Sequence, residues 1–257
     1  MLKGGENNYL NWEEKTITDF SDEAVRDLYN QGYVFTRKGK GVMQQTRSVR
    51  VDLSKFELSS ENRRILKQLE GIELNVESLP MEDYSWQIAK LAKDFYSTKF
   101  GPTSPEASRG KLIFSANKVK ELLTDPDKSN FNALISFSNP LLSGPSAKLG
   151  LGYTICYAGE GLLHYSYPFY SLHNDSSDSE STQSKDAITS VPKSMGLGMM
   201  LMAIMLAKEQ GDKYVYLGSA TRPTDTYKLQ FSGLEWFDKD TGWQTDLERL
   251  KTSLKQV

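Results

Sequence analysis

The stretch that decides the fold runs over residues 191–237 and reads VPKSMGLGMMLMAIMLAKEQGDKYVYLGSATRPTDTYKLQFSGLEWF. Its pattern predicts, in order, a loop with Gly196 and Gly198, an apolar helix, a strand over Tyr214–Gly218, and a segment centred on Tyr227 and Lys228. A glycine turn that opens a helix leaves unpaired backbone N–H groups at the positive end of the helix dipole. The stretch therefore predicts a site for a phosphate or another anion.

The composition is that of an ordinary soluble globular protein, with 25% charged and 38% hydrophobic residues in 257. The formal net charge is −2, so any nucleic-acid binding must use a local basic patch. The single cysteine, Cys156, excludes an internal disulfide and a cysteine-based zinc site, and we expect a buried structural thiol and no metal. Without a signal peptide or a long apolar run, we expect a cytoplasmic protein that does not enter membranes. The oligomeric state stays open.

Outward from this stretch, the pattern predicts helices and strands in alternating groups. Expected helices lie over 21–31, 59–69, 81–100, 116–124 and 246–256, and expected strands over 33–37, 47–53, 131–137, 149–158 and 161–169. The Ser/Asp-rich segment 173–193 is expected to be a mobile loop. The order predicts a mixed α/β (α+β) fold with a largely antiparallel sheet and one crossover helix. We expect an N-terminal extension over 1–20, one domain over 21–245 and a C-terminal helix or tail over 246–257.

Two blocks of the sequence resemble a known family. The first is MQQTRSVRVDLSKFELSSENRRIL over 43–66, and the second is the opening stretch with its TYKLQFSGLEW element. Together they are similar to aminoacyl-tRNA–protein transferases, the arginyltransferases and bacterial leucyltransferases. The positions that carry the resemblance are Gly32, Tyr33, Arg50, Phe56, Arg63 and Arg64, and then Tyr227, Lys228, Phe231 and Glu235.

The resemblance implies a GNAT-like acyltransferase fold and a defined reaction. Such an enzyme moves an amino acid from aminoacyl-tRNA to the N-terminal α-amine of an acceptor protein or peptide, and it needs no cofactor besides this donor. The sequence departs from the family by lacking its N-terminal cysteine-rich domain. Met43, Gln44 and Gln45 stand where the family has cysteines, and Gly233 and Leu234 replace a proline. The chain resembles a shortened, divergent member.

A basic patch is the first candidate binding surface. Between Asp27 and Asp52 there are five basic residues and no acid, and further basic residues follow. We expect contacts with tRNA phosphates or an acceptor carboxylate from Arg47, Arg50, Arg63 and Arg64. The alternative is a solvated hairpin face and helix surface.

The second candidate site combines the glycine loop with the Tyr-Lys segment. Lys193 precedes Gly196 and Gly198 by the spacing of a GNAT pyrophosphate loop, although a plain helix-entry turn gives the same pattern. Tyr227 would donate a proton to the departing ribose oxygen, Lys228 would support the oxyanion or a phosphate, and Glu235 would orient the amine or take its proton. A packed tyrosine, a snorkelling lysine and a surface glutamate are the structural alternatives.

Two other functions fit the same residues. One is an acetyl-CoA-dependent N-acyltransferase whose Lys193–Gly198 loop holds the pyrophosphate. The other is a non-catalytic GNAT-like module that binds RNA or a protein. His164, inside an aromatic strand, is expected to be a hydrogen-bonded core residue rather than a ligand or base.

Overall fold

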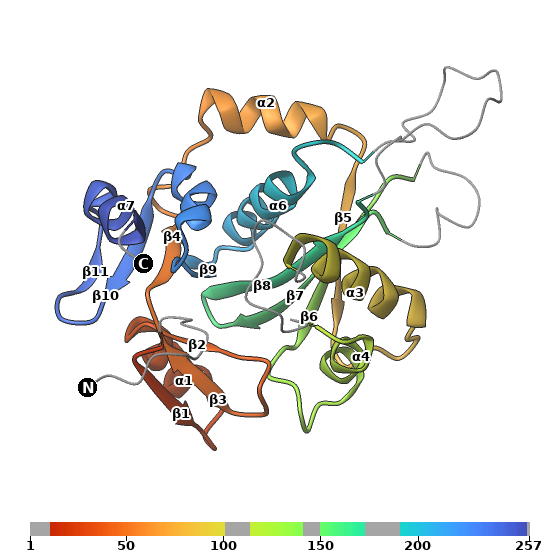
Figure 1. Ribbon diagram of the computed structural model, residues 1–257, viewed down its shortest axis with the longest axis horizontal. Helices are drawn as coiled ribbons and strands as arrows, with labels where there is room; N and C mark the ends of the chain where they lie inside the picture. Colours follow the sequence, from red (N-terminus) through yellow and green to blue (C-terminus); the bar gives the residue numbers. More distant parts are fainter. Residues whose placement is uncertain (1–10, 101–113, 141–149, 173–190, 256–257) are drawn as a thin grey trace.

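A computed structural model describes residues 11–100, 114–140, 150–172 and 191–255 (Figure 1). Most of the expected mobile loop, over 173–190, lies outside the described residues, as do residues 1–10 of the expected N-terminal extension.

The chain forms helices and strands in an alternating order. The strands are β1 (Glu13–Thr16), β2 (Tyr33–Phe35), β3 (Val42–Gln45), β4 (Ser48–Asp52), β5 (Glu73–Ser78), β6 (Ala133–Ser138), β7 (Gly152–Gly159), β8 (Leu162–Tyr170), β9 (Tyr214–Ser219), β10 (Leu234–Asp238) and β11 (Gly242–Gln244). The helices are α1 (Asp22–Asn30), α2 (Ser60–Gln68), α3 (Trp86–Phe100), α4 (Ala116–Thr124), α6 (Met195–Glu209), the 3₁₀ helix η1 (Pro223–Gln230) and α7 (Leu247–Lys255).

Eight strands form one large sheet in the order β11-β10-β4-β9-β8-β7-β6-β5. Every neighbouring pair is antiparallel except β8 and β9, which are parallel and are joined by the crossover helix α6. The predicted fold class, a largely antiparallel mixed sheet flanked by helices with one crossover, is therefore confirmed.

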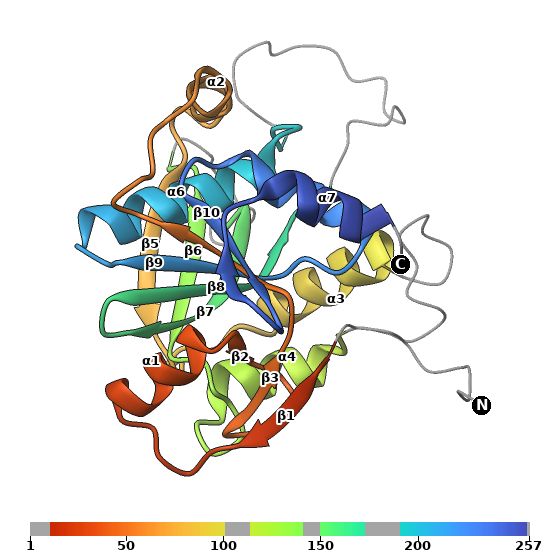
Figure 2. The same cartoon turned by 90° about the vertical axis from the view of Figure 1, so that its left-hand side faces the viewer.

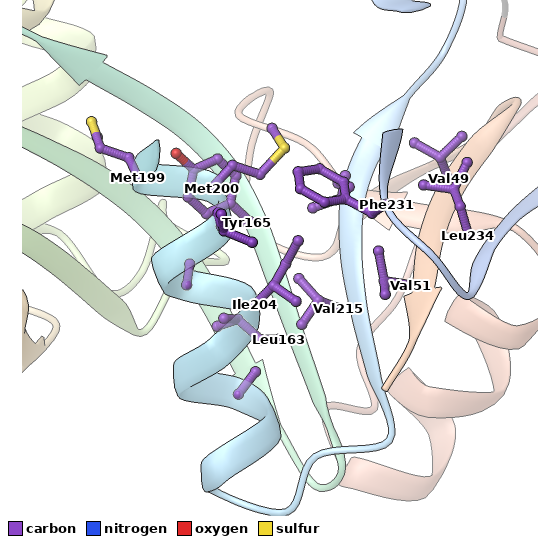
Figure 3. Packing of buried hydrophobic residues seen from close by; sticks show 14 of the residues in the cluster. Val49, Val51, Leu163, Tyr165, Met199, Met200, Ile204, Val215, Phe231 and Leu234 are labelled. Atoms are coloured by element: carbon purple, nitrogen blue, oxygen red, sulfur yellow. The ribbon is translucent and has the colours of Figure 1, made fainter. Parts of the chain in front are cut away.

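Helices cover both faces of this sheet (Figure 2). On one face, α6 packs over β8 and β9, with α2 and α7 beside it. Figure 3 shows Ile204 of α6 beside Leu163 of β8 and Val215 of β9, with the Met200 side chain extending toward Phe231. The other face carries α1, α3, α4 and a small sheet of order β1-β3-β2. Each face of the large sheet therefore packs against its own hydrophobic core.

Local signals explain where the helices begin. The Ser21 hydroxyl accepts a hydrogen bond from the Ala24 amide at 3.4 Å and caps α1. Ser59 and Asn62 form a reciprocal capping box that opens α2. The apolar helix α6 needs no polar face, because the sheet covers one side of it and α2 another.

Some expected elements were wrong. The strands expected over 33–37 and 47–53 are not paired as a hairpin: β2 pairs with β3 in the small sheet, and β4 lies between β9 and β10 in the large one. Residues 13–16 of the expected N-terminal extension form β1, which pairs with β3. The helix expected from residue 81 begins at Trp86. Strand β5 was not expected from the sequence, and its residues are mostly exposed at the sheet edge.

Candidate functional site at the parting of strands β8 and β9

Strands β8 and β9 pair over only part of their lengths. Their parallel register extends from Leu162↔Tyr214 to His164↔Tyr216, although β8 continues to Tyr170 and β9 to Ser219. Beyond His164 each strand keeps its antiparallel neighbour, β7 or β4, but not the other. The ends of the two strands therefore do not pair with each other.

The 3₁₀ helix η1 brings Lys228 to this point. Its side chain is buried, and Nζ donates a 2.7 Å hydrogen bond to the Ser219 carbonyl at the end of β9. The Lys228 charge also acts on His164 of β8, so the lysine lies at the end of β9 and within electrostatic range of β8. Burying an ammonium costs solvation free energy, and the hydrogen bond to the Ser219 carbonyl offsets part of that cost.

Asp225 fixes η1 and balances this charge. Its Oδ2 accepts the Thr221 and Arg222 amides at 2.9 Å each, and Arg222 Nη2 lies 2.9 Å from Oδ1. Burial opposes ionisation of Asp225, but Lys228, Arg222 and the backbone donors outweigh it and lower its pKa. Sequence reasoning missed this residue, although an Asp three positions after Arg222 in a proline-opened turn is a local capping signal.

Tyr227 lies next to Lys228 but faces outward. It is 46% exposed, and the Lys228 ammonium lies 5.8 Å from its ring centroid. The fully buried Tyr165 of β8 interacts electrostatically with Tyr227. Burial raises the pKa of Tyr165 well above its ordinary value, so this phenol stays protonated. One accessible tyrosine and one buried lysine thus stand together where the strands part.

His164 is a neutral core residue in this arrangement. Its Nδ1 lies 2.9 Å from the Tyr29 hydroxyl, and its ring is 1% exposed. Burial and then the Lys228 charge lower its pKa to about 3. The expectation of a hydrogen-bonded strand histidine is confirmed.

Glu235 and Arg50 form a buried ion pair in the sheet. They are register partners on β10 and β4, and Arg50 Nε and Nη2 lie 2.9 and 2.8 Å from Glu235 Oε2. The guanidinium lies between the rings of Tyr214 and Trp243, at 3.7 and 3.8 Å from their centroids. Lys55 adds a 3.3 Å contact to Glu235 Oε1. Arg50, predicted to bind the acceptor, and Glu235, predicted to act in catalysis, are therefore each other's ion-pair partners.

The other predicted arginines lie at different places. Arg63 is exposed on α2, and neighbouring Arg64 makes a bidentate contact with Glu61 at 2.7 and 2.6 Å. Arg47 is partly buried just before β4, and its carbonyl accepts a hydrogen bond from the Ala220 amide that follows β9. Its Nε and Nη1 are inaccessible and have no hydrogen-bond partner among the described residues, and burial lowers its pKa against the opposing effect of Asp238. The structure therefore does not bring the four arginines into one cluster.

The predicted anion loop opens α6, beside α2. Lys193 is exposed, and the Met195 and Gly198 amides already donate to Pro192 and Ser194 carbonyls. A Cβ at Gly198 would lie 2.2 Å from Leu69 Cδ2, and one at Gly196 would lie 3.0 Å from the Tyr170 ring. Close packing against these side chains explains both glycines without a ligand.

Within the described ranges, no group of three or more His, Cys, Asp or Glu side chains is placed to hold a metal ion. Among the same residues, no helix has the length and apolar character needed to cross a bilayer.

Comparison with known proteins gives distant likenesses in structure only. No family model matches the chain, and no curated protein matches its sequence. The solved structures it resembles include L-PGS from Bacillus licheniformis, with 15% identity, a TM-score of 0.43, and coverage of 90% of this chain and 69% of that one. The C-terminal domain of a putative lysylphosphatidylglycerol synthetase from Agrobacterium fabrum is 13% identical, with a TM-score of 0.41 and coverage of 78% of this chain and 52% of that one. FemX is 10% identical, with a TM-score of 0.38 and coverage of 77% of this chain and 60% of that one. Likenesses this distant assign neither a family nor an activity.

Proposed function

We propose that this protein transfers the aminoacyl group of an aminoacyl-tRNA to the N-terminal α-amine of an acceptor protein or peptide. The observation that carries the proposal is the position of Lys228 and Tyr227 beside the parted ends of β8 and β9. These residues belong to the YK-x-x-F element on which the resemblance to aminoacyl-tRNA–protein transferases rests.

The chemistry needs little beyond positioning and charge stabilisation. The acceptor amine nitrogen attacks the ester carbonyl carbon, the new C–N bond forms, and the bond to the ribose oxygen breaks. One proton leaves the amine and one reaches the ribose oxygen, so the reaction is balanced without an added reagent. Lys228 would stabilise the tetrahedral oxyanion, and the accessible Tyr227 hydroxyl would deliver the proton to the ribose oxygen.

Glu235 takes no direct part in the proposed transfer reaction. Its carboxylate is already held by Arg50 and Lys55, so its role is to fix β10 against β4. The tRNA body would contact exposed basic residues such as Arg63 through its phosphates, which gives salt-dependent affinity.

A coenzyme-A-dependent reaction is less well supported. It would use the Lys193–Gly198 loop as a pyrophosphate cradle, but Leu69 and Tyr170 occupy the space that its glycines leave open. The packing of α6 against α2 and β8 accounts for these glycines.

A donor and acceptor screen tests the proposal. The protein is incubated with a mixture of charged tRNAs and peptides that begin with each amino acid, and product masses identify the residue added. Parallel arms replace the peptides with phosphatidylglycerol vesicles, because one structural neighbour is named a lysylphosphatidylglycerol synthetase, or replace the donor with acetyl-CoA. A peptide product from the tRNA donor supports the proposal, whereas products only with acetyl-CoA or only on the lipid refute it.

Variants then connect the activity to the site. Lys228→Met should slow transfer by about 10²–10³-fold, the usual effect of removing an oxyanion donor. Tyr227→Phe should slow it by roughly 10²-fold or more if the phenol is the general acid. The matched control is Lys239→Met, at an exposed turn position. Full activity of Lys228→Met would exclude this residue from the chemistry.

A further inference from the structure

A pocket of about 290 Å³ lies between the start of α1 and the loop from α4 to β6. Its walls come from Phe20 and Asp22, from Lys40, from the segment 125–132, and from Tyr157 and Ala158 of β7. The volume is at the lower limit of small-molecule pockets, which suits a ligand about the size of an amino acid.

One part of the lining favours a positive charge. Asp22 makes only a long 3.4 Å contact, with the Glu160 amide, and none of the ion pairs found in the described part of the chain includes it. The nearby Tyr157 side chain is 9% exposed, and its hydroxyl makes no hydrogen bond to a described residue. Burial and then Asp22 raise the pKa of Tyr157 to about 12, so this hydroxyl stays protonated. Tyr157 lines the pocket, so its hydroxyl is available to a ligand placed there.

Another part of the lining carries a single ammonium. Lys40 Nζ donates one hydrogen bond, 2.9 Å long, to the Ser129 carbonyl and lies 4.9 Å from the Phe20 ring centroid. A lysine ammonium has three N–H donors, so two remain for an anion. The second acid of the pocket, Asp125, is already engaged by Lys128 at 2.9 Å and contributes little net charge.

The remaining walls combine polar residues, Ser129, Asn130 and Asn132, with apolar ones. Leu79, Pro80, Leu122 and Phe131 line the pocket, and Phe20 is 41% exposed although it is a large hydrophobic residue. An apolar ligand body would cover the Phe20 ring and remove it from water.

We propose that this pocket binds a free α-amino acid with an apolar side chain. Its ammonium would contact Asp22 and the Tyr157 hydroxyl, its carboxylate would contact Lys40, and its side chain would lie against Phe20. The inference does not rest on the transfer reaction, because the pocket contains none of the residues at the parting of β8 and β9.

Calorimetric titration of the full chain with three related probes tests the proposal. The probes are L-leucine, 3-methylbutylamine, which lacks the carboxylate, and 4-methylpentanoate, which lacks the amine. L-leucine should bind at least tenfold more tightly than either analogue. Asp22→Asn should weaken L-leucine and the amine about tenfold and leave the acid unchanged. Lys40→Met should weaken L-leucine and the acid and leave the amine unchanged.

Matched controls separate binding from folding. Glu23→Gln changes the next acid in the first turn of α1, and Lys38→Met changes an exposed lysine outside the pocket. Both should bind L-leucine like the unmodified protein, and circular dichroism should show all four variants folded. Failure of both L-leucine and L-phenylalanine to bind at millimolar concentration would overturn the proposal. Equal losses in Asp22→Asn and Glu23→Gln would overturn it as well.

Discussion

Replacing Glu235 with glutamine separates a structural role of this residue from a catalytic one. The substitution removes the negative charge but keeps the size of the side chain. It leaves the Arg50 guanidinium buried with 7% side-chain exposure, between two aromatic rings and with neutral partners at Tyr216 (3.1 Å) and Asn30 (3.3 Å). An uncompensated buried charge of this kind destabilises a fold by about 3–5 kcal/mol. For a chain of this size, the melting temperature should fall by roughly 6–20 °C.

Urea denaturation provides the assay. Unfolding is followed by far-UV circular dichroism and by tryptophan fluorescence, which reports on this region because Trp243 lies 3.8 Å from the guanidinium. The double variant Arg50→Met with Glu235→Leu should recover most of the lost stability, since it removes both charges and keeps the volume. The control is Glu61→Gln, which breaks the exposed pair with Arg64 and should leave the melting temperature nearly unchanged.

The urea midpoint of Glu235→Gln also decides whether this reasoning is wrong. If Glu235→Gln unfolds at the same urea concentration as Glu61→Gln, the pair does not hold β10 against β4. If it also abolishes transfer at unchanged stability, Glu235 acts in the chemistry, as the sequence predicted.

Three further predictions concern the core. His164 is neutral in the folded protein, where its pKa is about 3, but takes a proton near pH 6.5 when the chain is unfolded. Between these pH values the unfolded chain binds more protons, so stability falls as the pH is lowered. The unfolding free energy of the unmodified protein should therefore fall more steeply than that of His164→Gln, by up to about 1.4 kcal/mol per pH unit between pH 6 and 3, and parallel curves would contradict the low pKa. Gly198→Ala should destabilise the fold by about 1–3 kcal/mol in urea titrations, because its Cβ would meet Leu69, and Leu69→Ala should remove most of this difference. Burial raises the pKa of the Cys156 thiol to about 12, so iodoacetamide should label it in guanidinium but not in the native state, and fast native labelling would show that β7 opens.

Much of the local structure follows from short-range signals. The caps at Ser21 and Ser59 and the turn at Gly161, with its φ of 72°, fix the limits of α1, α2 and the β7–β8 hairpin. Each depends on residues a few positions apart, so periodicity and turn chemistry are sufficient to predict them. The pairing of β2, β3 and β4 is different, because nothing in the sequence near Gln45 says that the chain leaves one sheet and enters another.

The candidate site divides in the same way. Its Tyr227 and Lys228 were chosen from the sequence, and the tertiary structure brings Lys228 within electrostatic range of His164 and Tyr227 within range of Tyr165. The sequence also selected Arg50 and Glu235 for function, but their 185-residue separation hides the register that makes them one buried ion pair. Charged residues usually stay in water, so their burial against each other cannot be read from charge alone.

By itself, the sequence determined the apolar helix that follows the glycine loop, the short strand behind it and the mixed, largely antiparallel class of fold. These depend on side-chain period and local caps, which act within a few residues. Only the tertiary structure decided that both glycines make room for Leu69 and Tyr170, and that β8 and β9 part beyond His164. The physical reason is that packing and strand register are set by residues far apart in the chain, whose contacts form only when the whole sheet is assembled.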